Sequence, residues 1–598
     1  MEPAALLVIL MLATTCCALL AGFPVSFTLA GIALLFSFLG QLFGLEGLIG
    51  NLPARIFGSA ISNETLIAVP MFVYMGVMLE RSQVAENLLR ALSGLFGRLP
   101  GGLAIAVVLV GAMLAASTGI VGATVVAMGV ISLPTMLRSG YAPSLAAGTI
   151  CAAGTLGQII PPSIVLVILG DQISAAYQEA QSHLQQKAWA EGNMDFTPQA
   201  VSVGDLFAGA LLPGLLLVGL FIAYLLARGA LTPAALPPTK ETDDPQDWIA
   251  ILNALVAPLL LILAVLGSIL LGIAPPGEAA AVGAVGATLL AARNTQAMSG
   301  NPDPEEPQST KLGWTIGGFL AGAILGAVLF AGTRQFFFMT GLFACIGALG
   351  LPMLSRIAAV RRVAARLDPG GKMPINCAGL SLIALAGLIL AVDLRGNGGG
   401  LTSIAMAGAA LLCLISAWGI AIAFRRCHAA GILPYVNRRT VEITAMIFTI
   451  LIAASLFSLV FRGLGGDDLI AGLLRSLPGD GFWALLAVML VMFVLGFFLD
   501  FVEIALVVVP IVAPILLMTG QIDPIWLGVL MAMNLQTSFL TPPFGFALFY
   551  LRGVAPAALQ TQDIYRGAVP FIGLQIAAIV LIWIWPGLST WLPKLIFG

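Results

Sequence analysis

Two groups of polar side chains stand inside long apolar stretches and contain similar kinds of residue. The first begins at Ser117-Thr118-Gly119 and continues at Gly154 to Ser163, which reads GTLGQIIPPS. The second begins at Asp500 and continues at Gln536 to Gly545, which reads QTSFLTPPFG. Proline lacks the backbone N–H and clashes with the preceding turn, so a helix must open at each Pro-Pro pair. Backbone opened in this way inside a membrane has to line a cavity or bind a ligand.

The opened backbone and the nearby hydroxyls suit two ligands. N–H groups at helix N-termini, with the positive end of the helix dipole, suit a carboxylate. Freed carbonyl oxygens, with Ser and Thr hydroxyls, suit Na⁺, a hard cation that oxygen atoms bind without a dedicated charge. We predict two sites for cations, one with Ser117, Thr118, Gly119, Gly122, Gly154, Thr155 and Gly157 and the other with Glu503, Gln536, Thr537 and Thr541. We predict that the anion is bound by Gln158, Pro161, Pro162, Ser163, Asp500, Ser538, Pro542 and Pro543.

Each of these features also has a simpler structural interpretation. A Pro-Pro pair can merely kink a helix, and the small residues 117–119 can serve close helix packing. Asp500 and Glu503 can be protonated or can pair with a neighbour. Two Pro-Pro pairs at matching positions, beside Thr, Ser and Gln, favour a binding site over a kink. For Glu64, after Ser62-Asn63, and Glu278, after Pro-Pro-Gly, we expect a role at a helix start.

The two polar groups belong to an internal repeat. The matching positions are offset by 380 or 381 residues and are Pro134 with Pro514, Gly140 with Gly520, Pro143 with Pro524, and the two Pro-Pro pairs. Upstream, Leu99-Pro100-Gly101 matches Leu477-Pro478-Gly479. Arg98 and Arg138 place the start of the first copy in the cytoplasm, and Asp480 and Asp523 place that of the second outside. The two copies are therefore predicted to be inverted.

Each copy contains two unusual elements. The first is a pair of apolar arms of about 15 residues, too short to cross a bilayer about 30 Å thick. We predict re-entrant hairpins at 101–137, with a tip at 117–122, and at 481–518, with a tip at 499–503. The second element is a long helix broken at the Pro-Pro pair. Inverted repeats with broken helices at the membrane midplane are typical of secondary transporters.

The composition requires a membrane protein. The chain has 598 residues, of which 60% are hydrophobic and 9% charged, and its mean hydropathy is +1.05. Soluble domains contain roughly 25% charged residues. We expect about 14 membrane spans, beginning near residues 3, 24, 65, 144, 205, 248, 278, 313, 335, 375, 401, 440, 524 and 564. The first is a retained span rather than a signal peptide, because no cation precedes it.

The sequence lacks the residues and motifs that several other functions require. The 26 Lys and Arg nearly balance the 28 Asp and Glu, which gives no basic surface for nucleic acid. Only two histidines, His183 and His428, occur, both in expected loops, and the seven cysteines are scattered. No phosphate-binding, dinucleotide-binding or zinc-protease motif is present. We therefore expect no organic cofactor and no enzyme activity.

Cationic loops set the predicted orientation. Arg clusters at 356–366 and 425–439 mark cytoplasmic connections, and the polar stretch 171–204 lies outside. Pro-rich charged linkers are expected at 229–247 and 294–311, and membrane-surface segments at 83–97 and 467–476. The expected divisions are scaffold helices 1–100, transport repeat 101–170, scaffold helices 205–292, additional helices 313–424, a scaffold helix and connector 438–480, transport repeat 481–553 and a C-terminal helix 564–592.

Four runs carry a family resemblance: AVPMFVYMGVMLERS (68–82), GTLGQIIPPS, FLDFVEIALVVVPIVAPI (498–515) and TSFLTPPFG. They resemble the large membrane subunit of the tripartite ATP-independent periplasmic (TRAP) transporters, over about residues 1–292 and 438–592. The fold class so implied is an all-α polytopic membrane protein with an inverted repeat, two re-entrant hairpins and two broken helices, of the elevator type. The block 313–424 departs from the family by about four extra spans, which we expect to be scaffold.

The resemblance implies a sodium-coupled importer of a small organic acid, such as a C4-dicarboxylate or sialic acid, in the bacterial inner membrane. Its expected partners are a periplasmic substrate-binding protein, a small four-helix membrane subunit and the lipid bilayer. One alternative is a sodium- or proton-coupled carboxylate transporter of the same architecture that needs no binding protein. A remote alternative is a membrane-embedded enzyme with Asp500 and Glu503 as acid and base. No Arg lies in the proposed cavity, so the sequence does not identify the solute.

Overall fold

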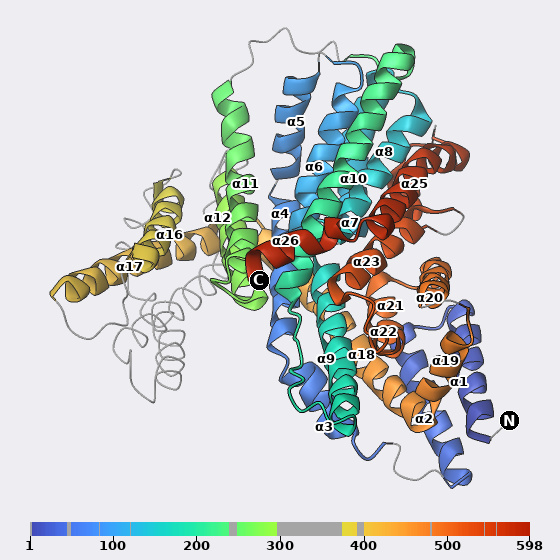
Figure 1. Ribbon diagram of the computed structural model, residues 1–598. Helices are drawn as coiled ribbons and strands as arrows, with labels where there is room; N and C mark the ends of the chain where they lie inside the picture. The colour runs from blue at the N-terminus through green and yellow to red at the C-terminus, as the bar shows by residue number, and fades with distance from the viewer. Residues whose placement is uncertain are drawn as a thin grey trace. The chain divides into compact units, whose positions relative to one another are not determined.

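The computed structural model describes residues 3–44, 49–82, 84–97, 99–119, 121–238, 248–295, 373–391, 400–478, 481–542, 545–557 and 559–598, and these form helices and connections with no strand (Figure 1). They fall into two compact units, described separately here. Unit 1 comprises 1–76, 85–283 and 440–598, and unit 2 comprises 77–84 and 284–439. The spans expected near 313 and 335 lie outside the described residues.

The first polar group of the sequence lies on four helices of unit 1. They are α6 (Gly102–Thr118), α7 (Val121–Arg138), α8 (Pro143–Thr155) and α9 (Ile164–Ala190). Helices α6 and α7 contact each other, and both pack against α8. Gly119 ends α6 with φ +59°, a conformation that glycine adopts without a steric penalty. A 3₁₀ turn (Leu156–Gln158) and five non-helical residues separate α8 from α9, so the helix is broken at the first Pro-Pro pair as expected.

The second polar group lies on a matching series of helices. They are α20 (Phe482–Leu495), α21 (Phe501–Val507), α22 (Val509–Leu517), α23 (Pro524–Leu540) and α24 (Phe546–Val554). Residues 496–500 form the turn between α20 and α21, and the helical path stops again between α23 and α24, at the second Pro-Pro pair. Pro543 lies outside the described residues. Both interruptions follow from the prolines, while the inversion of the two copies stays a prediction.

A single late helix, α25 (Thr561–Ile584), packs against both α8 and α23. Figure 1 shows α8 and α25 side by side. Their backbones touch, because a Cβ at Gly148 would come within 2.0 Å of the Gly567 carbonyl oxygen. Small residues allow such an approach between membrane helices. Helix α25 therefore joins the two series of helices, although it lies outside both copies of the repeat.

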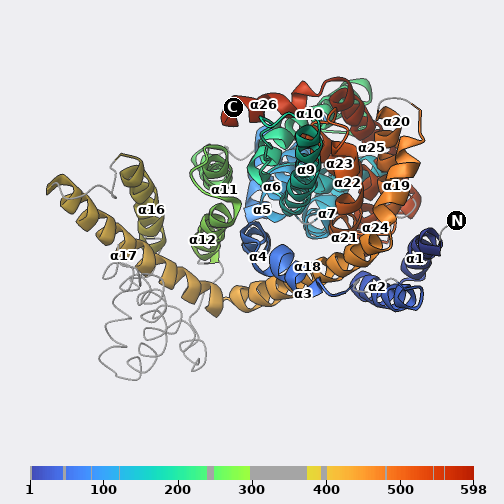
Figure 2. The ribbon, with the colours of Figure 1, turned by 60° about the horizontal axis from the view of Figure 1, so that its bottom comes forward.

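The other helices of unit 1 surround this core. Figure 2 shows α9, α22 and α23 grouped together, in agreement with their contacts. The remaining elements are α1 (Pro3–Leu20), α2 (Val25–Leu42), α3 (Leu52–Ile56), the π-helix η1 (Phe57–Ile61), the 3₁₀ turn η2 (Glu64–Ile67), α5 (Val84–Phe96), α10 (Val203–Leu231), the 3₁₀ turn η4 (Pro233–Ala235), α11 (Trp248–Leu270), α19 (Gly466–Arg475) and α26 (Gly587–Phe597). Four helices contribute residues to both units: α4 (Ala68–Arg81), α5, whose first residue Val84 belongs to unit 2, α12 (Pro276–Thr295) and α18 (Ile432–Gly463).

Unit 2 contains the helix pair α16 (Met373–Ala391) and α17 (Gly400–Ala429). The two helices pack closely, and the Ser381 and Ser416 hydroxyl oxygens lie 2.8 Å apart. Elsewhere in this unit the Arg81 guanidinium stacks 3.8 Å from the centroid of the Tyr435 ring. Part of the additional block thus forms a helix pair, and its role as scaffold stays a prediction.

The number of long apolar helices differs from the expected 14 spans. Within the described residues, six helices are long and apolar enough to cross a membrane, or seven if Leu52–Ile61 and Glu64–Arg81, bent by 50°, count as one span. The spans expected near 144 and 524 are shorter helices, α8 and α23, because each ends at a Pro-Pro break. Conversely, α7 has 18 residues and is among the six, so the expectation that this arm is too short to cross was wrong.

Parts of two expected loops, 171–204 and 425–439, are helical. His183 lies in α9, which extends to Ala190, and His428 lies in α17. Arg438 and Arg439 belong to α18, which is separated from α17 only by Ala430 and Gly431. The sequence suggested loops because polar residues are dense there. Long cationic side chains can instead extend from helix ends toward water, so the charge pattern and a continuous helix are compatible.

Candidate functional site

The two broken helices meet at the hydroxyl of Thr155, the last residue of α8. Its Oγ1 donates to the Ala152 carbonyl oxygen at 2.9 Å. The same oxygen accepts from Gln536 Nε2 at 3.4 Å and from Gln575 Nε2 at 3.2 Å. Thr155 and Gln536, predicted in separate halves of the site, are thus in direct contact, and Gln575 of α25 joins them.

Three glutamine amides, those of the two donors to Thr155 and that of Gln158 in the adjoining 3₁₀ turn, are buried without complete hydrogen bonding. Gln158, Gln536 and Gln575 are fully buried. Among the described residues, the Oε1 atoms of all three, and Gln158 Nε2, have no hydrogen-bond partner. A buried polar atom without a partner costs about 1–3 kcal/mol. Uncharged oxygen atoms are the ligand type that a hard cation takes, so this cluster, which we call the Thr155 cluster, fits a bound Na⁺.

The first hairpin turn packs on the start of α9. A Cβ at Gly119 would come within 2.9 Å of the Ile164 backbone nitrogen. Added Cβ atoms at Gly122 and Gly154 would lie within 2.8 Å of the Tyr550 ring and 2.3 Å of Val125 Cγ2. These glycines therefore permit close packing, the simpler of the two interpretations, and their role in cation binding stays a prediction.

The other residues predicted to bind ligands near the first helix break differ in what the structure describes of them. Ser117 and Thr118 end α6, but their side chains lie outside the described set. Gly157 is buried in the 3₁₀ turn, and the Ser163 hydroxyl donates to the Gln158 carbonyl oxygen at 3.3 Å. Pro161 and Pro162, joined by a cis peptide bond, lie in the break beside them.

Asp500 and Glu503 form a capping box at the start of α21. Asp500 Oδ1 accepts from the Phe501 backbone N–H at 2.7 Å, and Glu503 Oε2 accepts from the Asp500 backbone N–H at 2.9 Å. Each carboxylate thus binds a neighbouring backbone group, a capping role that the sequence analysis expected only for Glu64 and Glu278. Among the described residues, no hydrogen bond joins either carboxylate to the Thr155 cluster. Their predicted roles toward substrate and cation therefore stay predictions.

The second hairpin turn packs on the end of α23. A Cβ at Gly496 would come within 2.1 Å of Ser538 Oγ. The hydroxyls of Thr537, Ser538 and Thr541 donate to carbonyl oxygens of their own helical path at 2.8, 2.7 and 2.7 Å. Each hydroxyl oxygen keeps lone pairs that can accept or coordinate. Pro542 is half-buried in this break.

Sequence reasoning missed Gln575, which completes the contacts of Thr155. The reasoning compared the two repeat copies, and α25 lies in neither. A signal was present, because Gln575 is an isolated amide in the apolar run GLQIAAIVLIW. A polar side chain at that position in a membrane helix indicates a partner in the interior of the protein.

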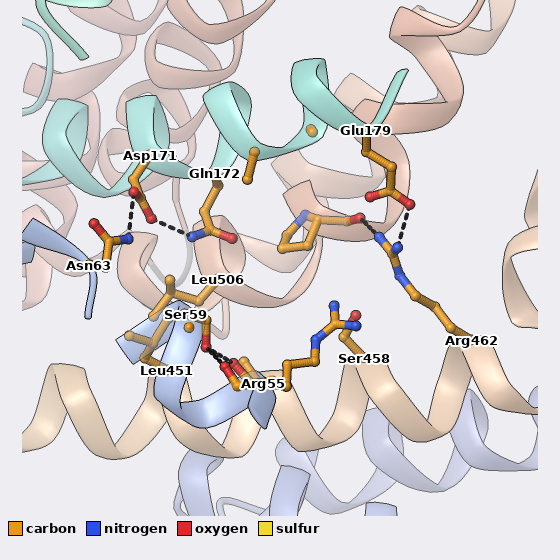
Figure 3. A pocket seen from close by; sticks show the side chains of 16 residues that line it. Arg55, Ser59, Asn63, Asp171, Gln172, Glu179, Leu451, Ser458, Arg462 and Leu506 are labelled. Carbon is orange, nitrogen blue, oxygen red and sulfur yellow. Dashed lines mark hydrogen bonds and ion pairs between the residues drawn. The ribbon is translucent and has the colours of Figure 1, made fainter. Parts of the chain in front are cut away.

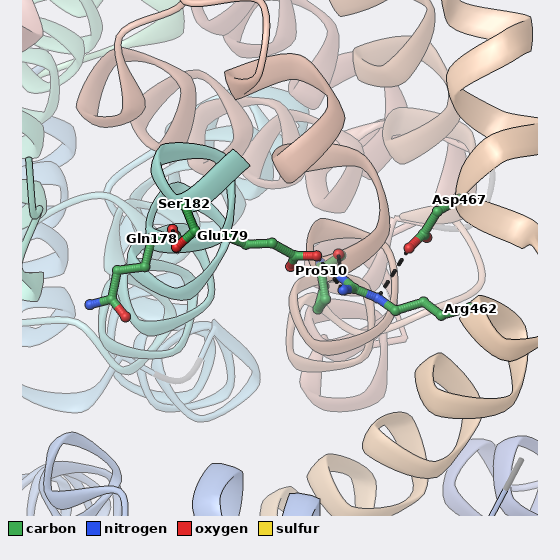
Figure 4. A network of polar contacts seen from close by, with 6 residues as sticks. All are labelled: Gln178, Glu179, Ser182, Arg462, Asp467 and Pro510. Atoms are coloured by element: carbon green, nitrogen blue, oxygen red, sulfur yellow. Dashed lines mark hydrogen bonds and ion pairs between the residues drawn. The ribbon is translucent and has the colours of Figure 1, made fainter. Parts of the chain in front are cut away.

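A second polar network, also missed, is centred on Arg462 at the end of α18 (Figure 4). The guanidinium pairs with Glu179 of α9, donates from Nη2 to the Pro510 carbonyl oxygen of α22 at 2.9 Å, and lies with Nε 3.5 Å from Asp467 Oδ2 of α19. Burial raises the pKa of the Asp467 carboxyl, and the Arg462 charge opposes this effect. One side chain thus ties α18 to three other helices.

Comparison with known proteins identifies the family. The family model described as "Tripartite ATP-independent periplasmic transporter, DctM component" matches residues 9–184, 194–342 and 306–588. The chain belongs to this family. The C4-dicarboxylate TRAP transporter large permease protein DctM of Vibrio cholerae is 26% identical over 588 residues, which cover 97% of this chain and 96% of the relative. The resemblance stated from the sequence is confirmed.

Other TRAP relatives match parts of the chain. The isethionate TRAP transporter permease protein DctMQ of Oleidesulfovibrio alaskensis is 22% identical over 89% of this chain and 59% of its own length. The ectoine TRAP transporter large permease protein TeaC of Halomonas elongata is 36% identical over 27% of this chain and 37% of its own length. Among solved structures, the Alcanivorax borkumensis YdaH transporter aligns with a TM-score of 0.44 at 13% identity, over 90% of this chain and 88% of that one, too distant to argue from.

Family membership fixes the broad function. The chain is the large permease subunit of a TRAP transporter, an integral protein of the inner membrane, and its relatives are transporter subunits rather than enzymes. A TRAP large permease works with a periplasmic binding protein and a small membrane subunit.

Proposed function

We propose that this subunit imports a small organic acid, delivered by a periplasmic binding protein, together with Na⁺ by an elevator movement of the hairpins and broken helices. The observation that supports the proposal most directly is the Thr155 cluster, where both helix breaks and α25 converge on unsatisfied buried oxygens. The relative that spans almost the whole chain is named for C4-dicarboxylates, so a four-carbon dicarboxylate is the first solute to test.

The residues of the cluster have distinct tasks in this proposal. Gln158, Gln536 and Gln575 supply amide oxygens, and Thr155 holds two of these amides by accepting from their nitrogens. A bound Na⁺ would supply the positive charge that these neutral groups lack. The hairpin turns, held against the breaks at Gly119 and Gly496, then keep the N–H groups of the opened backbone in place for a carboxylate.

Uptake by the reconstituted complex tests whether transport of the acid is coupled to Na⁺. The full chain, with its small subunit and binding protein, is placed in liposomes, and succinate uptake is measured with Na⁺ or with K⁺ outside. We expect uptake only with Na⁺, and we expect Gln536→Ala to raise the Na⁺ concentration for half-maximal uptake about tenfold or more. Gln178→Ala, an exposed glutamine of α9, is the matched control.

Three results would count against the proposal. Equal uptake in K⁺ would exclude sodium coupling, and an equal effect of both Gln substitutions would remove the assignment of the Thr155 cluster. Full uptake without the binding protein would favour the alternative of a carboxylate transporter that works alone. A further panel of isethionate, sialic acid and ectoine tests the solute class, because relatives carry these names.

A further inference from the structure

A polar cavity of about 240 Å³ lies within unit 1, apart from the Thr155 cluster (Figure 3). Its walls come from α3, η1 and α18 on one side and from α9, α21 and α22 on the other. The lining includes Arg55, Asn63, Asp171, Gln172, Ser458 and Arg462. The cavity is smaller than the roughly 300–1,000 Å³ of sites for drug-sized ligands, a size suited to a small acid.

The charges around this cavity are unequally satisfied. Asp171 accepts from Asn63 Nδ2 at 2.8 Å and from Gln172 Nε2 at 3.0 Å, and Glu179 is paired with Arg462. Among the described residues, the guanidinium of Arg55 has no hydrogen bond and no carboxylate oxygen within 4 Å, although the charges of Glu179 and Asp467 act on it from farther away. The lining thus offers one cation whose hydrogen-bonding groups are available.

A second unsatisfied group lies beside Arg55. Ser458 is only 5% exposed, and its hydroxyl has no hydrogen-bond partner among the described residues. Figure 3 shows the Arg55 side chain directed along α18 toward Ser458. A guanidinium with a neighbouring hydroxyl donor is a pair that binds a carboxylate or a sulfonate, since Arg presents a planar fork of N–H groups to such anions.

The walls of the cavity relate it to the proposed transport movement. Helix α9 continues from the first break, and α21 and α22 follow the second hairpin turn, whereas α3 and α18 belong to neither repeat copy. A ligand here would touch both groups of helices. The predicted orientation puts the stretch 171–204 outside and the start of α18, with Arg438 and Arg439, in the cytoplasm. The cavity, which lies at 171–179 of α9 and 451–462 of α18, is therefore expected near the periplasmic side, where a solute arrives.

We propose that this cavity is a receiving site for the organic anion, in which Arg55 pairs with its carboxylate or sulfonate and Ser458 donates a hydrogen bond. The inference rests on the proposed function, because it names the place at which the same solute first contacts the permease. The two carboxylates of the lining, Asp171 with its amide donors and Glu179 paired with Arg462, would repel a second anionic group, which favours anions small enough to approach Arg55 without contacting them.

Substitution of Arg55 tests the site in the reconstituted complex, with succinate, isethionate and sialic acid as probes. We expect Arg55→Gln to raise KM for the transported acid about tenfold or more, with the maximal rate within about twofold, and Arg55→Lys to have a smaller effect. Arg90→Gln is the control, because Arg90 is an exposed cation paired with Glu86 on α5. An unchanged KM in Arg55→Gln, or an equal rise in Arg90→Gln, overturns the proposal.

Binding of the acid can be measured without transport, so that the receiving site is tested independently of sodium coupling. The same acids are added to the purified complex, and the shift of its thermal unfolding is recorded. We expect an acid to stabilise the wild type but to stabilise Arg55→Gln and Ser458→Ala less. If no acid stabilises the wild type, the receiving site is wrong. The two proposals can also have different outcomes. If the acid stabilises the wild type but not Arg55→Gln, and uptake is the same in Na⁺ and K⁺, the receiving site is supported and the proposal of sodium coupling is wrong.

Discussion

At the scale of single residues, helix capping was the most predictable chemistry. Glu64 was expected at a helix start, and Asn63 indeed caps η2, with its Oδ1 accepting from the Thr65 backbone N–H at 3.0 Å. Glu278 lies in the first turn of α12, as expected. Caps depend on neighbours in sequence, so they can be found from sequence. The contacts of Gln575 and Arg462 join segments that are distant in sequence, so no local pattern predicts them.

Asp500 allows its capping role and its proposed role in transport to be separated. Asn caps a helix about as well as Asp, whereas Ala at such a position costs about 0.5–2 kcal/mol. We therefore expect Asp500→Asn to unfold at the wild-type temperature but to lose uptake, because the amide carries no negative charge. Asp500→Ala should lower the unfolding temperature and also lose uptake.

Thermal unfolding of the detergent-solubilised complex and uptake in liposomes supply the two readings. Wild-type uptake by Asp500→Asn would show that the carboxylate serves only the capping box. The exposed Asp195, changed to Asn, controls for loss of a charge on the same protein.

At the scale of elements, the breaks of α8 and α23 were predictable because proline acts on its own helix. The continuity of α18 through Arg438 and Arg439 was not, because helix ends depend on packing that a charge pattern does not record. The same holds for α7, whose 18 residues exceed the length expected for a hairpin arm. Chemistry local to a residue was thus predictable, and the lengths of elements were not.

The second hairpin turn gives a prediction at this scale. A methyl group at Gly496 would clash with Ser538, and overpacking of this kind costs about 1–3 kcal/mol. We expect Gly496→Ala to lower the unfolding temperature and uptake together. Adding Ser538→Gly removes the clashing atoms and should restore part of the stability, measured by thermal unfolding.

Gly472→Ala is the matched control, because nothing lies within 4 Å of a Cβ added there. If Gly496→Ala has the stability of the wild type, the turn does not rest on the end of α23. If the second substitution restores nothing, the clash is not the cause.

At the scale of the whole molecule, Arg462 connects α18 with α9, α19 and α22. In an elevator movement α9 and α22 would slide past α18, so these contacts would break and re-form in every cycle. We expect Arg462→Ala to change the maximal rate of uptake at least about twofold and to leave KM within about twofold, in contrast to Arg55→Gln. Initial rates over a range of succinate concentrations distinguish the two.

A double-mutant cycle isolates the ion pair. Arg462→Ala and Glu179→Gln should each destabilise the complex, with a coupling free energy of about 1 kcal/mol between them. Arg475→Ala removes an exposed cation of α19 and should change neither rate nor stability. Additive effects of the two substitutions, or a change in KM alone, would contradict a tie between α18 and α9.

The Thr155 hydroxyl carries a consequence for the transport cycle. Its single oxygen accepts from the amides of Gln536 and Gln575, which come from the second broken helix and from α25. Displacement of one amide leaves the other as sole donor and alters how tightly it is held. If a ligand bound at one break displaced its amide, the other amide would respond, and by linkage this influence would be reciprocal. The concentration of Na⁺ should consequently change the acid concentration that gives half-maximal uptake, and the concentration of the acid should change that of Na⁺ in the same sense.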